Sequence, residues 1–167
     1  MNERKESTTS IILEYVRVIV LTVIATFIFL QFVQISRVNG SSMENTYFQN
    51  NIVLIDKVFY KHSQPKRNDI IIVDYDDGLD DTLIIKRVIA VGGDHLDIKN
   101  NEVYINGKKI KESYIKENMN TEDLSIDIPK GKVFVMGDNR NHSLDSRKLR
   151  SEESRVGKEC RSRWSPY

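Results

Sequence analysis

TLIIKRVIAVGGD, residues Thr82 to Asp94, is the stretch that decides the fold. Its β-branched apolar run predicts a strand, and its closing Gly-Gly-Asp predicts a turn. Lys86 and Arg87 lie in the middle of the run, and alternation places one of them on the side of the core-forming residues. A buried amine without a partner tends to lose its proton. Either both residues lie at a solvated sheet edge, or the protein requires a neutral amine here.

Short strands bounded by turns are expected through the rest of this region. Apolar runs predict strands within residues 51–60, 70–75, 82–91, 102–110 and 126–136. Asn106-Gly107 is typical of a type I′ hairpin turn, whereas the polar residues 112–125 are expected to form a loop or a short helix. No second long helical pattern is present, so the sequence predicts a mainly β domain outside the cytoplasm.

The N-terminal part of the chain is predicted to span a membrane. No charged residue lies between Val18 and Ser36, the apolar stretch begins at Ile11, and about 20 residues suffice to cross a bilayer. A cleaved signal sequence is disfavoured because no small-residue cleavage site directly follows the apolar core. A buried soluble helix is a further alternative. The basic residues near the span predict a cytoplasmic N-terminus; they are Arg4, Lys5 and Arg17 before it, and Arg37 alone between it and Lys57.

Composition narrows the classes of function. The 167 residues carry a formal net charge of +1, which gives no electrostatic reason to expect a nucleic-acid partner. Cys160 is the single cysteine, so neither a disulfide framework nor a Cys/His metal cluster is expected. The acidic residues 74–81, DYDDGLDD, lack the register of a calcium loop and predict a solvated hairpin turn. We therefore expect no metal and no cofactor.

The last 18 residues, RSEESRVGKECRSRWSPY at 150–167, share no hydrophobic periodicity with the preceding chain. They resemble the conceptual translation of a sequencing-adapter oligonucleotide. The expectation is a non-native tail that takes no part in the fold. A genuine basic tail is the alternative.

Ser42 and Lys86 are the candidate catalytic pair. Alone, Ser42 in NGSSMENT would be a loop hydroxyl, and Lys86 would be an edge lysine that extends its stem along the sheet. A serine becomes a nucleophile when a base removes its proton, and a buried lysine can be that base. Sequence spacing does not show whether the two meet.

A third candidate element is MGDNRNHSLDSR, residues 136–147. Its polar and charged residues are Asp138, Arg140, Ser143, Asp145 and Arg147. They could form either a hydrogen-bonded ion-pair cluster or a well-capped surface loop.

Behind an N-terminal anchor, these three stretches together resemble the bacterial type I signal peptidases. GSSMENT is similar to the family's nucleophile box, IIKRVIAVGGD to its lysine box, and GDNRNHSLDSR to its last box. The resemblance implies an all-β catalytic domain of coiled sheets, like that of LexA-type repressors. It divides the chain into a cytoplasmic N-terminus (1–10), an anchor (11–36), an extracytoplasmic catalytic domain (37–149) and the tail (150–167).

The resemblance also implies roles for individual residues. Ser42 would be the nucleophile, with its backbone N–H facing the oxyanion, and Lys86 the general base. Ser143 would orient the lysine amine. The scaffold would comprise Asp145, Arg147, Asp138 and Arg87, and the substrate cleft would include Met43 and Gly40.

The implied protein is a membrane-bound serine endopeptidase that removes signal peptides from exported preproteins at the outer side of the cytoplasmic membrane. Substrates would lie extended along a β-edge, with small residues at −1 and −3. We expect a monomer that contacts the lipid bilayer and binds no nucleic acid.

Three departures from the family pattern bear on activity. Asn45 stands where proline is usual, which predicts a less rigid turn. Gly40 stands where some members have a hydroxyl that supports the oxyanion. Family domains continue into closing strands beyond Arg147, so the catalytic domain is expected to be incomplete at its C-terminal end.

Two rival interpretations stay open at this point. A self-cleaving repressor would carry a DNA-binding domain in place of the membrane span, and a catalytically inactive anchored protein would keep only the peptide groove. His62 and His95 are expected to be solvated. His142 is not expected to act as the base, because Lys86 fills that role.

Overall fold

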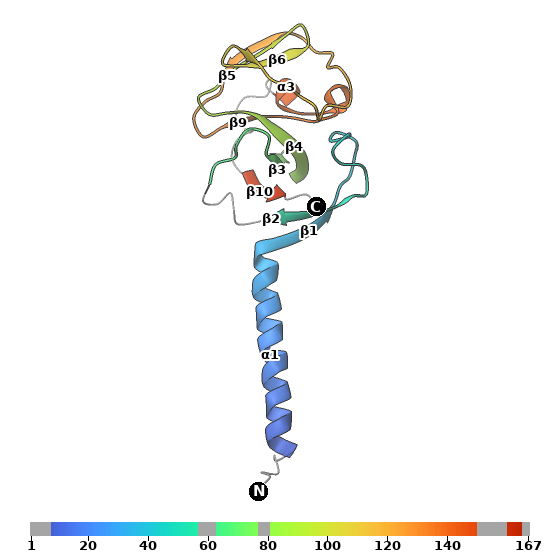
Figure 1. Ribbon diagram of the computed structural model, residues 1–167, viewed down its shortest axis with the longest axis vertical. Coiled ribbons are helices and arrows are strands. Elements are labelled where there is room, and N and C mark those ends of the chain that lie inside the picture. The colour runs from blue at the N-terminus through green and yellow to red at the C-terminus, as the bar shows by residue number, and fades with distance from the viewer. Residues whose placement is uncertain (1–7, 57–62, 77–80, 150–159, 165–167) are drawn as a thin grey trace.

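The structure is a computed structural model that describes residues 8–56, 63–76, 81–149 and 160–164. A single long helix, α1 (Thr8–Phe32), projects from a β domain (Figure 1). None of its residues is buried, and it is long and apolar enough to cross a membrane. Its 25 residues rise about 37 Å, against about 30 Å of bilayer hydrocarbon. The helix begins three residues before the expected span, and residues 33–36 belong instead to β1 (Val33–Arg37).

The first sheet has six antiparallel strands in the order β1-β2-β10-β3-β4-β9. Its strand β4, Asp81–Val91, is the one expected from the opening stretch, and it lies between β3 and β9. The other strands that follow β1 are β2 (Ile52–Asp56), β3 (Ile70–Asp76), β9 (Val133–Met136) and β10 (Cys160–Trp164).

Strand β10 differs from the expectation that residues 150–167 take no part in the fold. Its backbone lies between β2 and β3, with Arg163 opposite Asp56 and Ser162 opposite Ile72. Pairing of this kind needs only the free N–H and C=O groups of neighbouring strand edges, so hydrophobic periodicity does not reveal it. The adapter-like origin of these residues stays a prediction, and residues 150–159 and 165–167 lie outside the described chain.

The second sheet has the order β7-β6-β5-β8, with β5 (His95–Lys99), β6 (Glu102–Ile105), β7 (Lys108–Lys109) and β8 (Leu124–Asp127). Asn106 and Gly107 both have positive φ, at 51° and 77°, which confirms the predicted type I′ turn. Strand β8 begins where a loop or helix was expected, because pairing with β5 places Leu124 opposite Ile98. His62 and residues 77–80 of the acidic turn lie outside the described residues.

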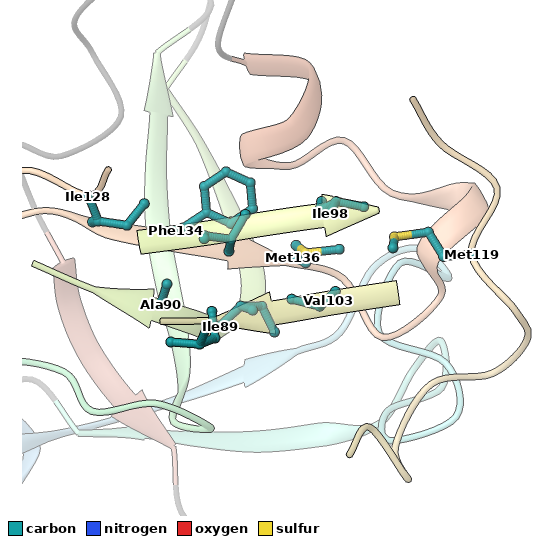
Figure 2. Packing of buried hydrophobic residues seen from close by; sticks show 10 residues of the cluster. Ile89, Ala90, Ile98, Val103, Met119, Ile128, Phe134 and Met136 are labelled. Atoms are coloured by element: carbon teal, nitrogen blue, oxygen red, sulfur yellow. The ribbon is translucent and has the colours of Figure 1, made fainter. Parts of the chain in front are cut away.

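The main core lies between the two sheets, where side chains of β4 and β9 pack against those of β5 and β6 (Figure 2). It contains Ile89, Ala90, Leu96, Ile98, Val103, Ile105, Met119, Ile128, Phe134 and Met136. A second cluster packs the chain between β1 and β2 onto β2 and β3, and contains Val38, Met43, Tyr47, Val53, Ile55 and Ile72. The expected class, mainly β with an apolar N-terminal helix, is confirmed.

His95 links two strands of the second sheet. Its Nδ1 lies 2.6 Å from an Asp127 carboxylate oxygen on β8, and its Nε2 lies 3.4 Å from Asp97. Hydrogen bonding to Asp127 raises the pKa of His95, with Asp97 adding to the effect. A raised pKa means that this stabilisation is complete below the ordinary histidine pKa and is lost as pH rises through the raised value.

We therefore expect His95→Gln to lower the melting temperature more at pH 5.5 than at pH 9. Thermal unfolding in detergent measures the difference, with the exposed His142→Gln as the matched control. An equal loss at both pH values would show that the His95 contacts do not depend on its charge.

Candidate active site

Strand β4 places Lys86 inside the protein and not at an edge. Ile71 of β3 lies opposite Lys86, and Met136 of β9 lies opposite the neighbouring Arg87. Lys86 is 2 % exposed and Arg87 is 8 % exposed. A register shift between Val88 and Ala90 interrupts the regular alternation, and all residues from 86 to 90 are buried. The solvated-edge interpretation of this stretch is therefore wrong.

Ser42 lies on the turn that follows β1. Backbone hydrogen bonds shape this turn, from Glu44 N–H to the Ser41 carbonyl (3.1 Å) and from Thr46 N–H to the Met43 carbonyl (2.8 Å). Met43 is 1 % exposed and packs in the second cluster, so it fixes the turn to the core. Gly40 precedes the turn with a φ of +96°, a backbone conformation that favours glycine.

The fold brings Ser42 and Lys86 into contact. Lys86 Nζ lies 2.8 Å from Ser42 Oγ and donates to the Ile85 carbonyl at 2.9 Å. Burial lowers the pKa of Lys86 to about 8, although the carboxylates of Asp145 and Asp138 oppose the shift. A useful fraction of the amine is therefore neutral near physiological pH, and a neutral amine can accept the serine proton.

Gly137 brings Ser143 beside the pair. A Cβ added to Gly137 would overlap both the Ser143 hydroxyl and the Ser42 carbonyl oxygen, so these groups converge on one glycine. Ser143 is buried, and its hydroxyl lies close enough to Asp145 to help lower the pKa of that carboxyl, but it makes no bond of good geometry among the residues that the structure describes. The expected bond from Ser143 to the lysine amine is not formed in this structure, and its orienting role stays a prediction.

Residues 136–147 form a buried ion-pair cluster, so the capped-surface-loop interpretation is wrong. Arg87 donates to both carboxylate oxygens of Asp138, at 2.8 and 2.7 Å. Arg147 donates likewise to Asp145, at 2.9 and 2.8 Å, and Asp145 also accepts from Gly137 N–H at 3.0 Å. Burial would raise the pKa of Asp145, but the hydrogen bonds and charge of Arg147, together with hydrogen bonds from Gly137 and Ser143, outweigh it and hold that pKa below its usual value.

Asn139 contributes contacts that the sequence did not suggest. Its backbone N–H donates to the Ser42 carbonyl at 3.0 Å, and its side-chain amide donates to the Ser41 carbonyl at 3.1 Å. Thr46 is a second such residue, because its hydroxyl donates to Asp138. Only the position of Asn139 inside the third motif could have suggested its role.

The described histidines supply no alternative base. His142 has an exposed side chain, and His95 lies in the second sheet. The described residues contain no group of His, Cys, Asp and Glu that could hold a metal ion.

Comparison with known proteins identifies similar sequences and structures. The family model "Signal peptidase, peptidase S26" matches residues 12–159. Signal peptidase I U of Bacillus subtilis is 37 % identical over 73 % of this chain and 71 % of that protein. Signal peptidase I of Bacillus licheniformis is 33 % identical over 87 % of this chain and 83 % of that protein. A crystal structure of a signal peptidase I from Enterococcus faecalis is 30 % identical, with a TM-score of 0.44, covering 51 % of this chain and 86 % of that one.

Gly137→Ala should reduce the rate of preprotein cleavage by about a hundredfold, because the new methyl group displaces Ser143 and the Ser42 backbone. Steady-state kinetics on a preprotein in detergent measures the loss. Gly131→Ala is the control: its Cβ meets open space, while its φ of +77° makes alanine strained there. The control should lose stability and keep its activity. Full activity of Gly137→Ala would contradict the close packing at this glycine.

Proposed function

Because the chain belongs to the signal peptidase family, peptidase S26, we propose that it removes signal peptides from preproteins with Ser42 as nucleophile and Lys86 as general base. The observation that carries this proposal is the 2.8 Å contact between Lys86 Nζ and Ser42 Oγ. The burial of Lys86 supports it further, because burial favours the neutral amine that a base must have.

The chemistry follows from this contact. Neutral Lys86 removes the proton from Ser42 Oγ, which attacks the scissile carbonyl carbon while the Ser42 N–H stabilises the oxyanion. The C–N bond then breaks, and the leaving amine of the mature protein takes the proton from Lys86. The signal peptide is left as an ester on Ser42. Lys86 next deprotonates a water that attacks this ester, and the released serine oxygen recovers the proton.

A small apolar pocket lined by residues of β2, β3 and β4 is a candidate for the proposed preference for small residues at −1 and −3. Ile85, which precedes Lys86, lines the pocket together with Tyr47 from the chain that follows Ser42. The complete lining is Tyr47, Val53, Ile70, Ile71, Ile72 and Ile85. The surface of this pocket is apolar, so we expect it to accept small apolar side chains and to exclude charged ones.

The apolar helix α1 is compatible with a membrane anchor, as expected for this family. We propose an orientation with the N-terminus in the cytoplasm, α1 (Thr8–Phe32) as the anchor and the β domain that begins at β1 outside, so that residues 33–36 of the expected anchor belong to the outer domain. Residues 1–7 are not described by the structure. An anchored monomer would meet a membrane-tethered preprotein in the same plane, which raises their effective concentration.

Ser42→Ala and Lys86→Ala should each abolish cleavage of a preprotein in liposomes, because the reaction then lacks its nucleophile or its base. The exposed Lys108→Ala on β7 is the control and should cleave at the rate of the unmodified protein. Cleavage that survives either active-site substitution would overturn the mechanism. Binding of the peptide without cleavage by the unmodified protein would favour the inactive anchored alternative.

The pH profile tests the role of Lys86 separately. Because the base must be neutral, kcat/KM should rise with pH, level off above a pKa of about 8 and fall about tenfold per unit below it. Initial rates between pH 6 and 9.5 measure this rising part of the profile, here called the acid limb. A flat profile over that range would exclude Lys86 as a base that titrates there.

A further inference from the structure

Residues 112–116, here called the strap, belong to none of the three sequence motifs. They lie in the connection between β7 and β8, outside the regular strands. The strap nevertheless contacts all three segments of the candidate site: the Ser42 turn, strand β4 and the turn that follows β9. Its contacts come from Glu112, Tyr114 and Lys116.

Glu112 forms the most buried of these contacts. Its carboxylate accepts from both terminal nitrogens of Arg140, at 2.9 and 2.5 Å. The Arg140 side chain is completely buried and that of Glu112 is 9 % exposed. Arg140 in turn donates from Nε to the carbonyl of Gly137 at 3.0 Å. Glu112 therefore holds an arginine that fixes the glycine on which Ser42 and Ser143 converge.

Tyr114 and Lys116 connect the strap to the other two segments. The guanidinium carbon of Arg87 lies over the Tyr114 ring, 4.0 Å from the ring centroid. The Tyr114 hydroxyl donates to Glu112 at 3.1 Å. Lys116 donates from its backbone N–H to the Asp138 carbonyl at 3.1 Å, and its ammonium pairs with Glu44 at 2.6 Å. The strap thus contacts the site through groups that take no part in the strand pairing.

Charge balance gives Glu112 a second effect. Three arginines surround the site, and each has one carboxylate: Arg87 with Asp138, Arg147 with Asp145 and Arg140 with Glu112. These three pairs are therefore neutral in sum, and the carboxylates of two of them, Asp138 and Asp145, act directly on the Lys86 amine. Without Glu112, an unpaired buried cation would remain and would disfavour a second positive charge on Lys86.

We propose that Glu112 is a positioning residue for the cleavage reaction: it holds the turn that carries Gly137 and neutralises the buried charge of Arg140. This inference rests on the proposed Ser42–Lys86 mechanism. Glu112 touches neither reacting group and acts through Arg140 and Gly137. Its loss should lower kcat because the turn loosens. It should also move the acid limb of the kcat/KM profile to lower pH, because Lys86 loses its proton more easily.

The test compares Glu112→Gln with Glu117→Gln in the full chain. Glu117 is an exposed acid just beyond the strap that accepts a hydrogen bond from Asn141, so its variant controls for loss of a nearby carboxylate. Glu112→Gln should lower kcat about tenfold with little change in KM, and should move the acid limb down by roughly half a unit. Glu117→Gln should change neither. Unchanged kcat and an unchanged limb in Glu112→Gln would overturn the proposal.

Glu112→Asp separates position from charge and keeps the test valid if the glutamine variant does not fold. It retains the carboxylate but shortens its reach, so kcat should fall while the acid limb stays in place. A kcat equal to that of the unmodified protein would refute the positioning role. Lys86→Ala in the same assay distinguishes the two proposals. If Lys86→Ala still cleaves, the Ser42–Lys86 mechanism is wrong. If Lys86→Ala is inactive and Glu112→Gln cleaves like the unmodified protein, only the role proposed for Glu112 is wrong.

Discussion

The burial of one lysine amine against one serine hydroxyl is the constraint around which the domain is organised. An amine removed from water loses hydration that no neutral neighbour fully replaces, and loss of its proton lowers this penalty. Strand β4 keeps Lys86 in that position because β3 and β9 cover both of its edges. The Ser42 turn then has to approach from outside the sheet, and Met43 fixes it there by packing into the second cluster.

The surrounding ion pairs contribute geometry more than stability. A buried arginine–carboxylate pair gains Coulomb energy but loses the hydration of both ions, so its net contribution to folding is small or negative. Its value here is directional, since two-pronged contacts fix a guanidinium in a single orientation. Arg147 and Arg140 thereby fix Asp145 and the Gly137 carbonyl, and both of these groups position the glycine between Ser42 and Ser143.

Much of this arrangement can be predicted from local sequence. The run at 82–91, the Asn106-Gly107 turn and the long apolar N-terminal segment each have a short-range cause, and each forms the expected element. Strands β8 and β10 could not be predicted from their own sequence patterns, because each forms through pairing with a partner strand distant in the sequence. The same holds at the site. Glu112 lies 28 residues from Arg140, and nothing in its own neighbourhood distinguishes it from the other acids of a polar segment.

The direct passage from α1 into β1 has a mechanical consequence. Phe32 ends the helix and Val33 begins a strand that pairs with β2 along its whole length, so no flexible linker separates them. The nine residues 33–41 are all that connect the helix to Ser42. In a membrane-anchored chain they act as a spacer of nearly constant length, which sets the height above the bilayer at which a bond can be cut. The cleavage position would then depend partly on distance from the lipid surface, in addition to the side chains that flank the bond.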